Sequence, residues 1–361
     1  MRPSRTLATA LVVFVLVSAA GPAAALPRGM RVKTYKSDLS FAVDMAWVPG
    51  TKKIFFTEKD TGKVRVLIGR SLRKRACVNL DVNANGYRGA LGIVLHPNYK
   101  RNHYLYVYYT NASPLENRVT RFTVRSNRCR DRKHIVTGIE ASSDGHLGGQ
   151  LEFAGGKLFV SVGDQGSPSN SQDTSNRLGK ILRYNPNGGV PSDNPFTGSL
   201  DDTSVWAYGL RNPFGLTKKP GTKKLFATDN GPDCDDELNR IRKGRNYGWG
   251  PGYECGTAGV GDDPESPLLR WSGIIAPTDP WWYKGRLKRL SGDIYVGDFS
   301  AGRLHRIVIN AKGTRVRRDR VIFKGNDGIL DVAKGPGRWL YFLTQSAIRR
   351  VVPDTARGSW L

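Results

Sequence analysis

The stretch Lys53-Ile54-Phe55-Phe56-Thr57 decides the fold, because its pattern returns five more times along the chain. Each copy is a short apolar and aromatic strand, then a turn with Gly, Asp or Asn, then a second strand that ends in Arg and apolar residues. The first strands lie at residues 53–57, 104–109, 157–162, 224–228, 293–296 and 339–343. The second strands lie at residues 64–67, 119–124, 180–184, 238–241, 304–309 and 348–351.

This repeat predicts an all-β, six-bladed β-propeller of four-stranded antiparallel blades. The copies start about 45 to 70 residues apart, which suits one blade plus variable loops. A single blade cannot bury both faces, so blades must stack, and a closed ring removes most exposed strand edges. A β-sandwich is the main alternative, but it does not explain a sixfold repeat. A further strand at residues 40–48 is expected to join the first blade or to help close the ring.

The first 25 residues have the layout of a secretory signal peptide. Arg2 and Arg5 precede an apolar run over residues 7–20, and an A-x-A site follows at residues 23–25. The run is too short for a transmembrane span, and no later segment is apolar for long enough. We predict cleavage after Ala25, one propeller domain over residues 26–361, and a secreted protein that is extracellular or periplasmic.

Four cysteines, an even number, predict disulfides in an exported chain. Of the three pairings, Cys77–Cys129 and Cys234–Cys255 are favoured because each pair is near in sequence. The chain has no C-x-x-C, which argues against a metal site formed by these cysteines. Four free buried thiols are the alternative.

The charge balance is strongly basic, with 56 Lys and Arg against 31 Asp and Glu and a net charge of +25. Such a surface attracts polyanions. The basic residues are scattered, as at Arg315, Arg317 and Arg318, and no nucleic-acid-binding motif accompanies them. We therefore expect a solvated basic surface that can contact a polyanion, with no specific nucleic-acid site.

The residues that can carry chemistry lie between positions 146 and 252. His146 is flanked by glycines in Gly-His-Leu-Gly-Gly, and Asp164 ends a strand in Val-Gly-Asp-Gln-Gly. A carboxylate can orient such a histidine as a base. Arg211 in Gly-Leu-Arg-Asn-Pro-Phe-Gly offers guanidinium donors for an anionic or carbonyl ligand. A structural histidine, an aspartate that caps a turn and a structural salt bridge are the alternatives.

Two other segments have alternative interpretations. Residues 229–239 read Asp-Asn-Gly-Pro-Asp-Cys-Asp-Asp-Glu-Leu-Asn, which favours a hard cation held by carbonyl and carboxylate oxygens, or a solvated acidic turn. Trp281-Trp282-Tyr283 is either a stacking platform for a sugar ring or a set of aromatics packed under a loop.

Taken together and in order, these segments resemble the soluble PQQ-dependent glucose/sorbosone (aldose sugar) dehydrogenase family. The similarity covers nearly the whole chain after residue 25, and the motifs are specific as a set. The matching segments are residues 89–97, 146–151, 163–166, 178–183, 191–196, 209–215, 231–239 and 246–249, with looser matches at 275–277 and 331–332. The family is a six-bladed propeller, in agreement with the repeat count.

The resemblance implies a role for each matching catalytic residue. His146 matches the general base that takes the proton of the sugar C1 hydroxyl while hydride passes to the quinone, and it also contacts the cofactor. Asp164 matches the carboxylate that orients this histidine. Arg211 matches the group that polarises the reactive quinone carbonyl, and Asn212 accompanies it at the cofactor.

The resemblance also implies PQQ and calcium as cofactors. The backbone carbonyls of Gly231 and Pro232 match ligands of the calcium that holds the quinone, and Glu237 and Tyr247 match a further calcium site. In such a quinoprotein the cofactor carries the hydride chemistry, and the protein supplies a base, an electrophile and a positioning cation. The implied substrate is a sugar that is oxidised to a lactone, and an external acceptor takes the electrons.

The sequence departs from the family where three cations hold the carboxylates of PQQ. Ser300 stands in place of a Lys, and Gly328 and Leu330 stand in place of two Arg; we call these three the clamp positions. Each lost charge-assisted bond is worth about 1.5–3 kcal/mol. We favour an active dehydrogenase. There are two alternatives: a propeller that has lost PQQ and binds glycans or polyanions, and a lactonase that uses calcium as a Lewis acid.

Overall fold

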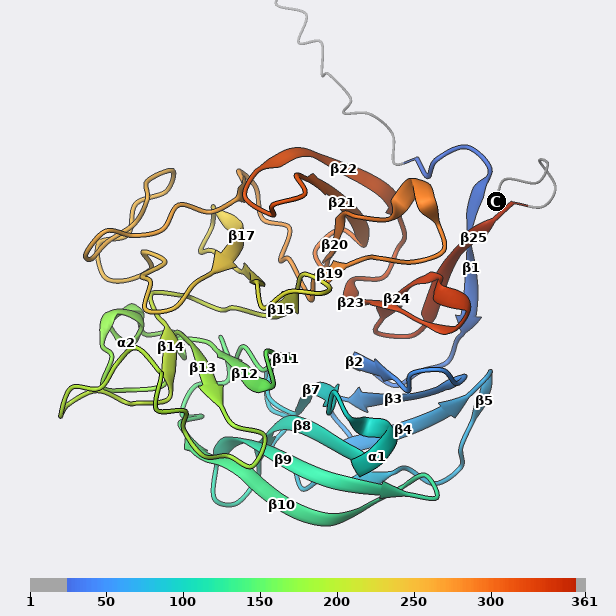
Figure 1. Ribbon diagram of the computed structural model, residues 1–361, viewed down its shortest axis with the longest axis horizontal. Coiled ribbons are helices and arrows are strands. Elements are labelled where there is room, and N and C mark those ends of the chain that lie inside the picture. The colour runs from blue at the N-terminus through green and yellow to red at the C-terminus, as the bar shows by residue number, and fades with distance from the viewer. Residues whose placement is uncertain (1–24, 355–361) are drawn as a thin grey trace, which may run out of the picture.

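A computed structural model of the protein describes residues 25–354. The predicted signal peptide, residues 1–25, lies outside the described residues except for Ala25. Six antiparallel sheets are arranged around a central axis, so that the chain forms a ring of six blades (Figure 1). The prediction of an all-β six-bladed propeller is confirmed.

The first strand of blades 1 to 6 lies next to the axis, and the later strands lie progressively farther out (Figure 1). Blade 1 contains β2 (Ala42–Trp47), β3 (Lys53–Glu58), β4 (Lys63–Ile68) and β5 (Ser71–Leu72), and β6 (Val78–Asn79) also pairs with β4. Blade 2 contains β7 (Ala90–Leu95), β8 (Tyr104–Asn111), β9 (Glu116–Arg125) and β10 (Arg128–Ile139). Blade 3 contains β11 (Leu151–Ala154), β12 (Lys157–Val162), β13 (Lys180–Tyr184) and β14 (Val205–Ala207).

The remaining three blades follow the same plan. Blade 4 contains β15 (Gly215–Lys218), β16 (Leu225–Asp229), β17 (Asp236–Ile241) and β18 (Leu269–Trp271). Blade 5 contains β19 (Trp281–Trp282), β20 (Ile294–Asp298), β21 (Arg303–Ile309) and β22 (Val316–Lys324). Blade 6 contains β23 (Ile329–Lys334), β24 (Leu340–Thr344), β25 (Ile348–Pro353) and β1 (Met30–Lys36). The helices are short: α1 (Tyr99–Asn102), α2 (Pro168–Gln172), η1 (Lys288–Leu290) and η2 (Pro336–Arg338).

The two ends of the chain close the ring. Strand β1 pairs antiparallel with β25, with Val32 opposite Val351, so the first strand of the chain completes the last blade. The next strand, β2, is the innermost strand of blade 1. The segment before the first repeat therefore both joins the first blade, through β2, and closes the ring, through β1. The pairing of β1 with β25 joins the two ends of the described chain in one sheet.

The repeated strand pair forms the middle of every blade. Phe55 and Phe56 show why these strands are almost continuously apolar. Successive side chains of a strand point to opposite faces, and both rings are fully buried. Phe55 packs in a cluster shared with Val107 of blade 2, whereas Phe56 packs with Tyr341 of blade 6. Each blade is thus covered on both faces by its neighbours, and stacking of blades forms the core.

Both predicted disulfides are present, which rules out four free thiols. Cys77–Cys129 joins blade 1 to blade 2, and Cys234–Cys255 joins two loops of blade 4. Within residues 25–354, no helix is both long enough and apolar enough to cross a membrane.

Candidate functional site

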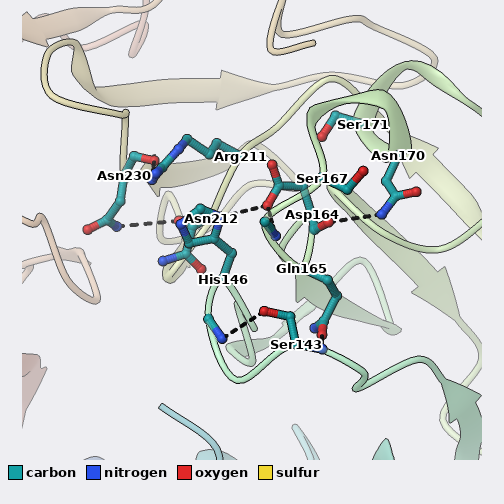
Figure 2. Close-up of polar contacts among 12 residues, drawn as sticks. Ser143, His146, Asp164, Gln165, Ser167, Asn170, Ser171, Arg211, Asn212 and Asn230 are labelled. Atoms are coloured by element: carbon teal, nitrogen blue, oxygen red, sulfur yellow. Dashed lines mark hydrogen bonds and ion pairs between the residues drawn. The ribbon is translucent and has the colours of Figure 1, made fainter. Parts of the chain in front are cut away.

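A cavity of about 270 Å³ lies at one end of the central axis, where loops of the blades meet. Its polar lining includes His146, Arg211, Asn212, Asn230 and Asp236. The rest of the lining is largely apolar and includes Phe41, Val43, Leu91, Phe214, Phe299 and Leu330. The cavity thus brings His146, Arg211 and Asn212, three of the residues predicted for the site, together (Figure 2).

His146 lies in the loop between β10 and β11 and is held there by a close contact with Gly163, the residue after β12. Its own backbone has a φ of +46°, an uncommon value for a residue other than glycine. A Cβ atom at Gly163 would lie 2.1 Å from the carbonyl oxygen of His146, so only glycine fits there. This approach brings His146 beside Asp164, the residue after Gly163.

Asp164 has the contacts of an ionised orienting carboxylate. Its Oδ1 lies 2.7 Å from His146 Nδ1 and accepts the Gly166 N–H at 2.8 Å, and its Oδ2 accepts the Trp249 indole N–H at 2.7 Å. The side chain is fully buried. Because an ionised carboxylate only accepts hydrogen bonds, the shared proton belongs to Nδ1, and Nε2 of His146 keeps a lone pair. The imidazole, which is 25% exposed, can therefore take a proton.

Arg211 and Asn212 are positioned by a buried carboxylate behind them. Asp229 accepts the backbone N–H groups of Arg211 at 2.9 Å and of Asn212 at 2.7 Å. Burial raises the pKa of Asp229 to about 8, although both N–H groups oppose this rise. The Asn212 side-chain oxygen accepts the Gly148 N–H at 3.1 Å, which ties this turn to the loop of His146.

The guanidinium of Arg211 keeps donor capacity for a ligand. Its Nη1 donates to the carbonyl of Asn230 at 3.1 Å (Figure 2), and its Nε is buried without a hydrogen-bond partner in the described chain. The guanidinium carbon lies 5.4 Å from the ring centroid of Trp249, within the range of a cation–π contact. The same indole therefore contacts both Asp164 and Arg211.

Gly231 and Pro232, the residues predicted to hold calcium, line the cavity. Across residues 25–354, no N–H or O–H group donates to the carbonyl oxygen of either residue. Asp236 orders this turn, because it accepts the N–H groups of Gly231, Ile275 and Ala276. The acidic segment is thus an organised turn, and the two carbonyls have no donor in the described chain; a cation there stays a prediction.

Glu237 and Tyr247 lie outside the cavity lining. The Glu237 carboxylate accepts hydrogen bonds from Asn239 at 3.0 Å and from Arg270 at 3.4 Å, and burial raises its pKa to about 7. The hydroxyl of Tyr247 donates to the Arg240 carbonyl and accepts the Arg242 N–H. Their polar side-chain atoms already have protein partners, and a second calcium site there stays a prediction.

None of the three clamp positions carries a cation, and the basic residues in the described lining of the cavity are Arg211 and Lys59. Leu330 lines the cavity directly, and Ser300 is exposed outside it. A Cβ atom at Gly328 would lie 2.6 Å from the ring of Phe299, which occupies this part of the wall. Nearby Arg303 lies 3.9 Å from Asp298 and does not line the cavity.

A buried charge cluster supports the end of β20, next to this wall. The Nδ1 of His305 lies 2.8 Å from Asp319, and its Nε2 lies 3.7 Å from Asp298, which is fully buried. Burial lowers the pKa of His305, but the two carboxylates outweigh it and raise the pKa to about 9. Phe299, which lines the cavity, directly follows Asp298.

Three buried carboxyl groups lie farther along the axis, with oxygens within 4.8 Å of one another. Each accepts a backbone N–H from a neighbouring blade. Asp44 accepts from Ile93 at 2.7 Å, Asp279 from Leu216 at 2.9 Å and Asp331 from Met45 at 3.0 Å. Burial, followed by the neighbouring carboxyl groups, raises the pKa of Asp279 and Asp331. These groups tie the innermost strands together.

Trp282 and Tyr283 are buried, and Trp282 packs against Phe226 with ring centroids 5.2 Å apart, as expected if these aromatics pack under a loop. One contact was not predicted by the sequence pattern. Trp249 belongs to a recognised segment but had no predicted role. It lies 85 residues from Asp164 in the chain, and no local pattern indicates that the two side chains touch.

Comparison with known proteins agrees with this fold. Residues 39–352 match the family model "Glucose / Sorbosone dehydrogenase". The chain is 26% identical to aldose sugar dehydrogenase YliI of Escherichia coli, over 92% of this chain and 95% of that protein. It is 27% identical to quinoprotein glucose dehydrogenase B of Acinetobacter calcoaceticus, over 87% and 85%. The structure of the PQQ-bound aldose sugar dehydrogenase of Streptomyces coelicolor superposes with a TM-score of 0.78, at 28% identity over 90% and 98% of the two chains. The match across almost the whole propeller shows that this chain belongs to the glucose/sorbosone dehydrogenase family.

Proposed function

We propose that the protein is a secreted sugar oxidoreductase that oxidises the C1 hydroxyl of an aldose to a lactone, with PQQ and calcium at the central cavity and an external electron acceptor. The observation that carries the proposal is the His146–Asp164 pair, which opens into the same cavity as Arg211. Bound PQQ would supply the hydride acceptor. Two relatives named above are sugar dehydrogenases, and a PQQ-bound structure is among the similar folds.

The protein groups have distinct tasks in this reaction. His146 accepts the proton of the sugar hydroxyl at Nε2, and the resulting imidazolium is stabilised by Asp164 through the 2.7 Å hydrogen bond at Nδ1. Arg211 offers guanidinium donors to an oxygen that gains negative charge, and the largely apolar cavity strengthens this interaction by excluding water. Asn212 keeps Arg211 in register with the histidine loop.

The residues present fit the reacting part of PQQ and the calcium ion. Arg211 Nε is buried without a partner in the described chain, and the carbonyls of Gly231 and Pro232 accept no hydrogen bond there. These groups would hold the quinone oxygens and the cation. Leu330 at the clamp positions offers no charge to the carboxylates, so we expect weak cofactor binding that needs added PQQ.

The test is reconstitution of the purified protein with PQQ and calcium, followed by dye reduction with a panel of aldoses and by a spectroscopic titration of PQQ. We expect turnover and a bound-PQQ spectrum. The variant His146→Ala should lose turnover but keep calcium binding. The matched control is His134→Ala, because His134 lies exposed on β10.

Absence of both PQQ binding and turnover with every sugar would refute the dehydrogenase proposal. The uncharged wall at Leu330 would then favour the second candidate, a secreted propeller of this family that binds glycans or polyanions without PQQ. Cleavage of lactones without added PQQ would instead point to a calcium-dependent hydrolase.

A further inference from the structure

A second cavity, of about 290 Å³, lies at the outer rim of the ring where blades 1 and 2 meet. Five of the eight residues that line it are basic: Lys63, Arg65, Lys74, Arg75 and Arg128. The first four belong to blade 1, and Arg128 begins β10 of blade 2. No acidic residue is among its lining. We call this the rim cavity.

Most of these cations are not neutralised by the protein. Arg65 pairs with Glu58 at 3.0 Å. Within residues 25–354, no carboxylate lies within ion-pair distance of Lys63, Lys74, Arg75 or Arg128. Four like charges around one small cavity repel one another, so an anion that binds there relieves this repulsion as well as forming new contacts.

The rim cavity is held in shape by covalent and hydrogen bonds. The Cys77–Cys129 disulfide joins the two blades beside it, and Cys129 N–H donates to the Cys77 carbonyl at 3.0 Å. Arg128 donates through Nη1 to the carbonyl of Ala76. Arg65 donates to Glu58 and to the Arg73 carbonyl, while its Nε is buried without a partner in the described chain. The two arginines are therefore fixed before any ligand arrives, which lowers the cost of binding.

The charge and size of the rim cavity select the class of anion. A carboxylate carries one negative charge, whereas a phosphate group carries about 1.5–2 charges at neutral pH and three acceptor oxygens. Guanidinium groups match phosphate oxygens in pairs, and lysine ammonium groups are strong point charges for them. Four unpaired cations around about 290 Å³ therefore suit linked phosphate groups better than a carboxylate of the same size.

We propose that the rim cavity binds a compact anion of two or more linked phosphate groups, either free or at the end of a larger molecule. This site is separate from the central cavity, because the two share no lining residue. The rim cavity also differs from the basic surface as a whole. Exposed arginines such as Arg317 and Arg318 line neither the rim cavity nor the central cavity.

The test is isothermal titration calorimetry of the full protein with sodium tripolyphosphate, in a buffer free of phosphate. The double variant Lys74→Glu/Arg75→Glu should bind about tenfold more weakly or worse. Both side chains are exposed, and no hydrogen bond to either side chain is seen in the described chain, so the fold should tolerate the change. The matched control is Arg317→Glu/Arg318→Glu, which alters the net charge equally and should bind as the unchanged protein does.

Two further ligands test whether the phosphate groups must be free and whether the cavity prefers phosphate to carboxylate. Adenosine triphosphate presents the same three phosphates at the end of a larger molecule, so its binding would show that an end group is accepted; binding of tripolyphosphate alone would show that only a free anion fits. Citrate should bind more weakly than tripolyphosphate. The proposal fails if the two double variants bind tripolyphosphate equally, or if citrate binds as tightly. A thermal melt of each variant confirms folding, and Lys63→Gln provides an independent variant at the same cavity.

Discussion

The contact between Trp249 and Asp164 can be measured in a double-mutant cycle of the free energy of unfolding. Trp249→Phe keeps most of the ring but removes the N–H that lies 2.7 Å from a fully buried carboxylate oxygen. A hydrogen bond to a charged group contributes about 1.5–3 kcal/mol, so the variant should lose about 2 kcal/mol. Asp164→Asn is the second arm of the cycle.

Asparagine at position 164 has one acceptor oxygen where aspartate has two. To keep the bonds from His146 and Gly166, its oxygen must take the place of Oδ1, which turns its NH₂ group toward the indole N–H of Trp249. Two donors then face each other, and this variant should also lose about 2 kcal/mol. In the double variant the opposing donor is gone, so the combined loss should fall short of the sum by about 1–2 kcal/mol.

Urea unfolding of the four proteins measures this coupling. Additive losses, within about 0.5 kcal/mol, would refute the hydrogen bond between Trp249 and Asp164. In the reconstituted enzyme, Trp249→Phe should also lower turnover, because Asp164 would then hold His146 less firmly. A change in stability without any change in turnover would assign Trp249 to the fold alone.

Three other predictions concern the charges around the axis. Asp298 and Asp319 raise the pKa of His305 to about 9, so protonated His305 should stabilise the protein at pH 6, and this effect should be lost as the pH rises through 9. The free energy of unfolding, measured in urea, should therefore fall by about 3 kcal/mol over this range, and His305→Gln should abolish the fall. Burial raises the pKa of Asp331 and so favours its neutral form in the folded protein, which means that stability falls as the pH rises above 4. Asp331→Asn should therefore raise the melting temperature more at pH 8 than at pH 4. An equal rise at both pH values would contradict this explanation. Leu330→Arg places a cation on the uncharged wall and should tighten PQQ binding about tenfold in a spectroscopic titration, whereas unchanged affinity would show that this wall does not face the cofactor carboxylates.

Local patterns were enough to predict the blades. A strand that is buried on both faces, as β3 is at Phe55 and Phe56, must be apolar at consecutive positions, and this requirement repeats in each blade. The disulfides were predictable because Cys77–Cys129 and Cys234–Cys255 each join positions near in sequence. Recognition of the family segments likewise identified His146 and Asp164 as a pair, and the structure places them 2.7 Å apart.

The tertiary structure decided what depends on contacts between distant segments. The ring closes because β1 pairs with β25, across nearly the whole chain. Trp249 contacts Asp164 because loops of blades 3 and 4 meet there, and Phe299, which follows β20 of blade 5, packs against Gly328, which precedes β23 of blade 6. The rim cavity depends on Arg128 of blade 2 lying beside the basic segment of blade 1. Sequence periodicity reports the burial of each strand, whereas these contacts depend on how the blades pack against one another, and that packing is set by the ring as a whole.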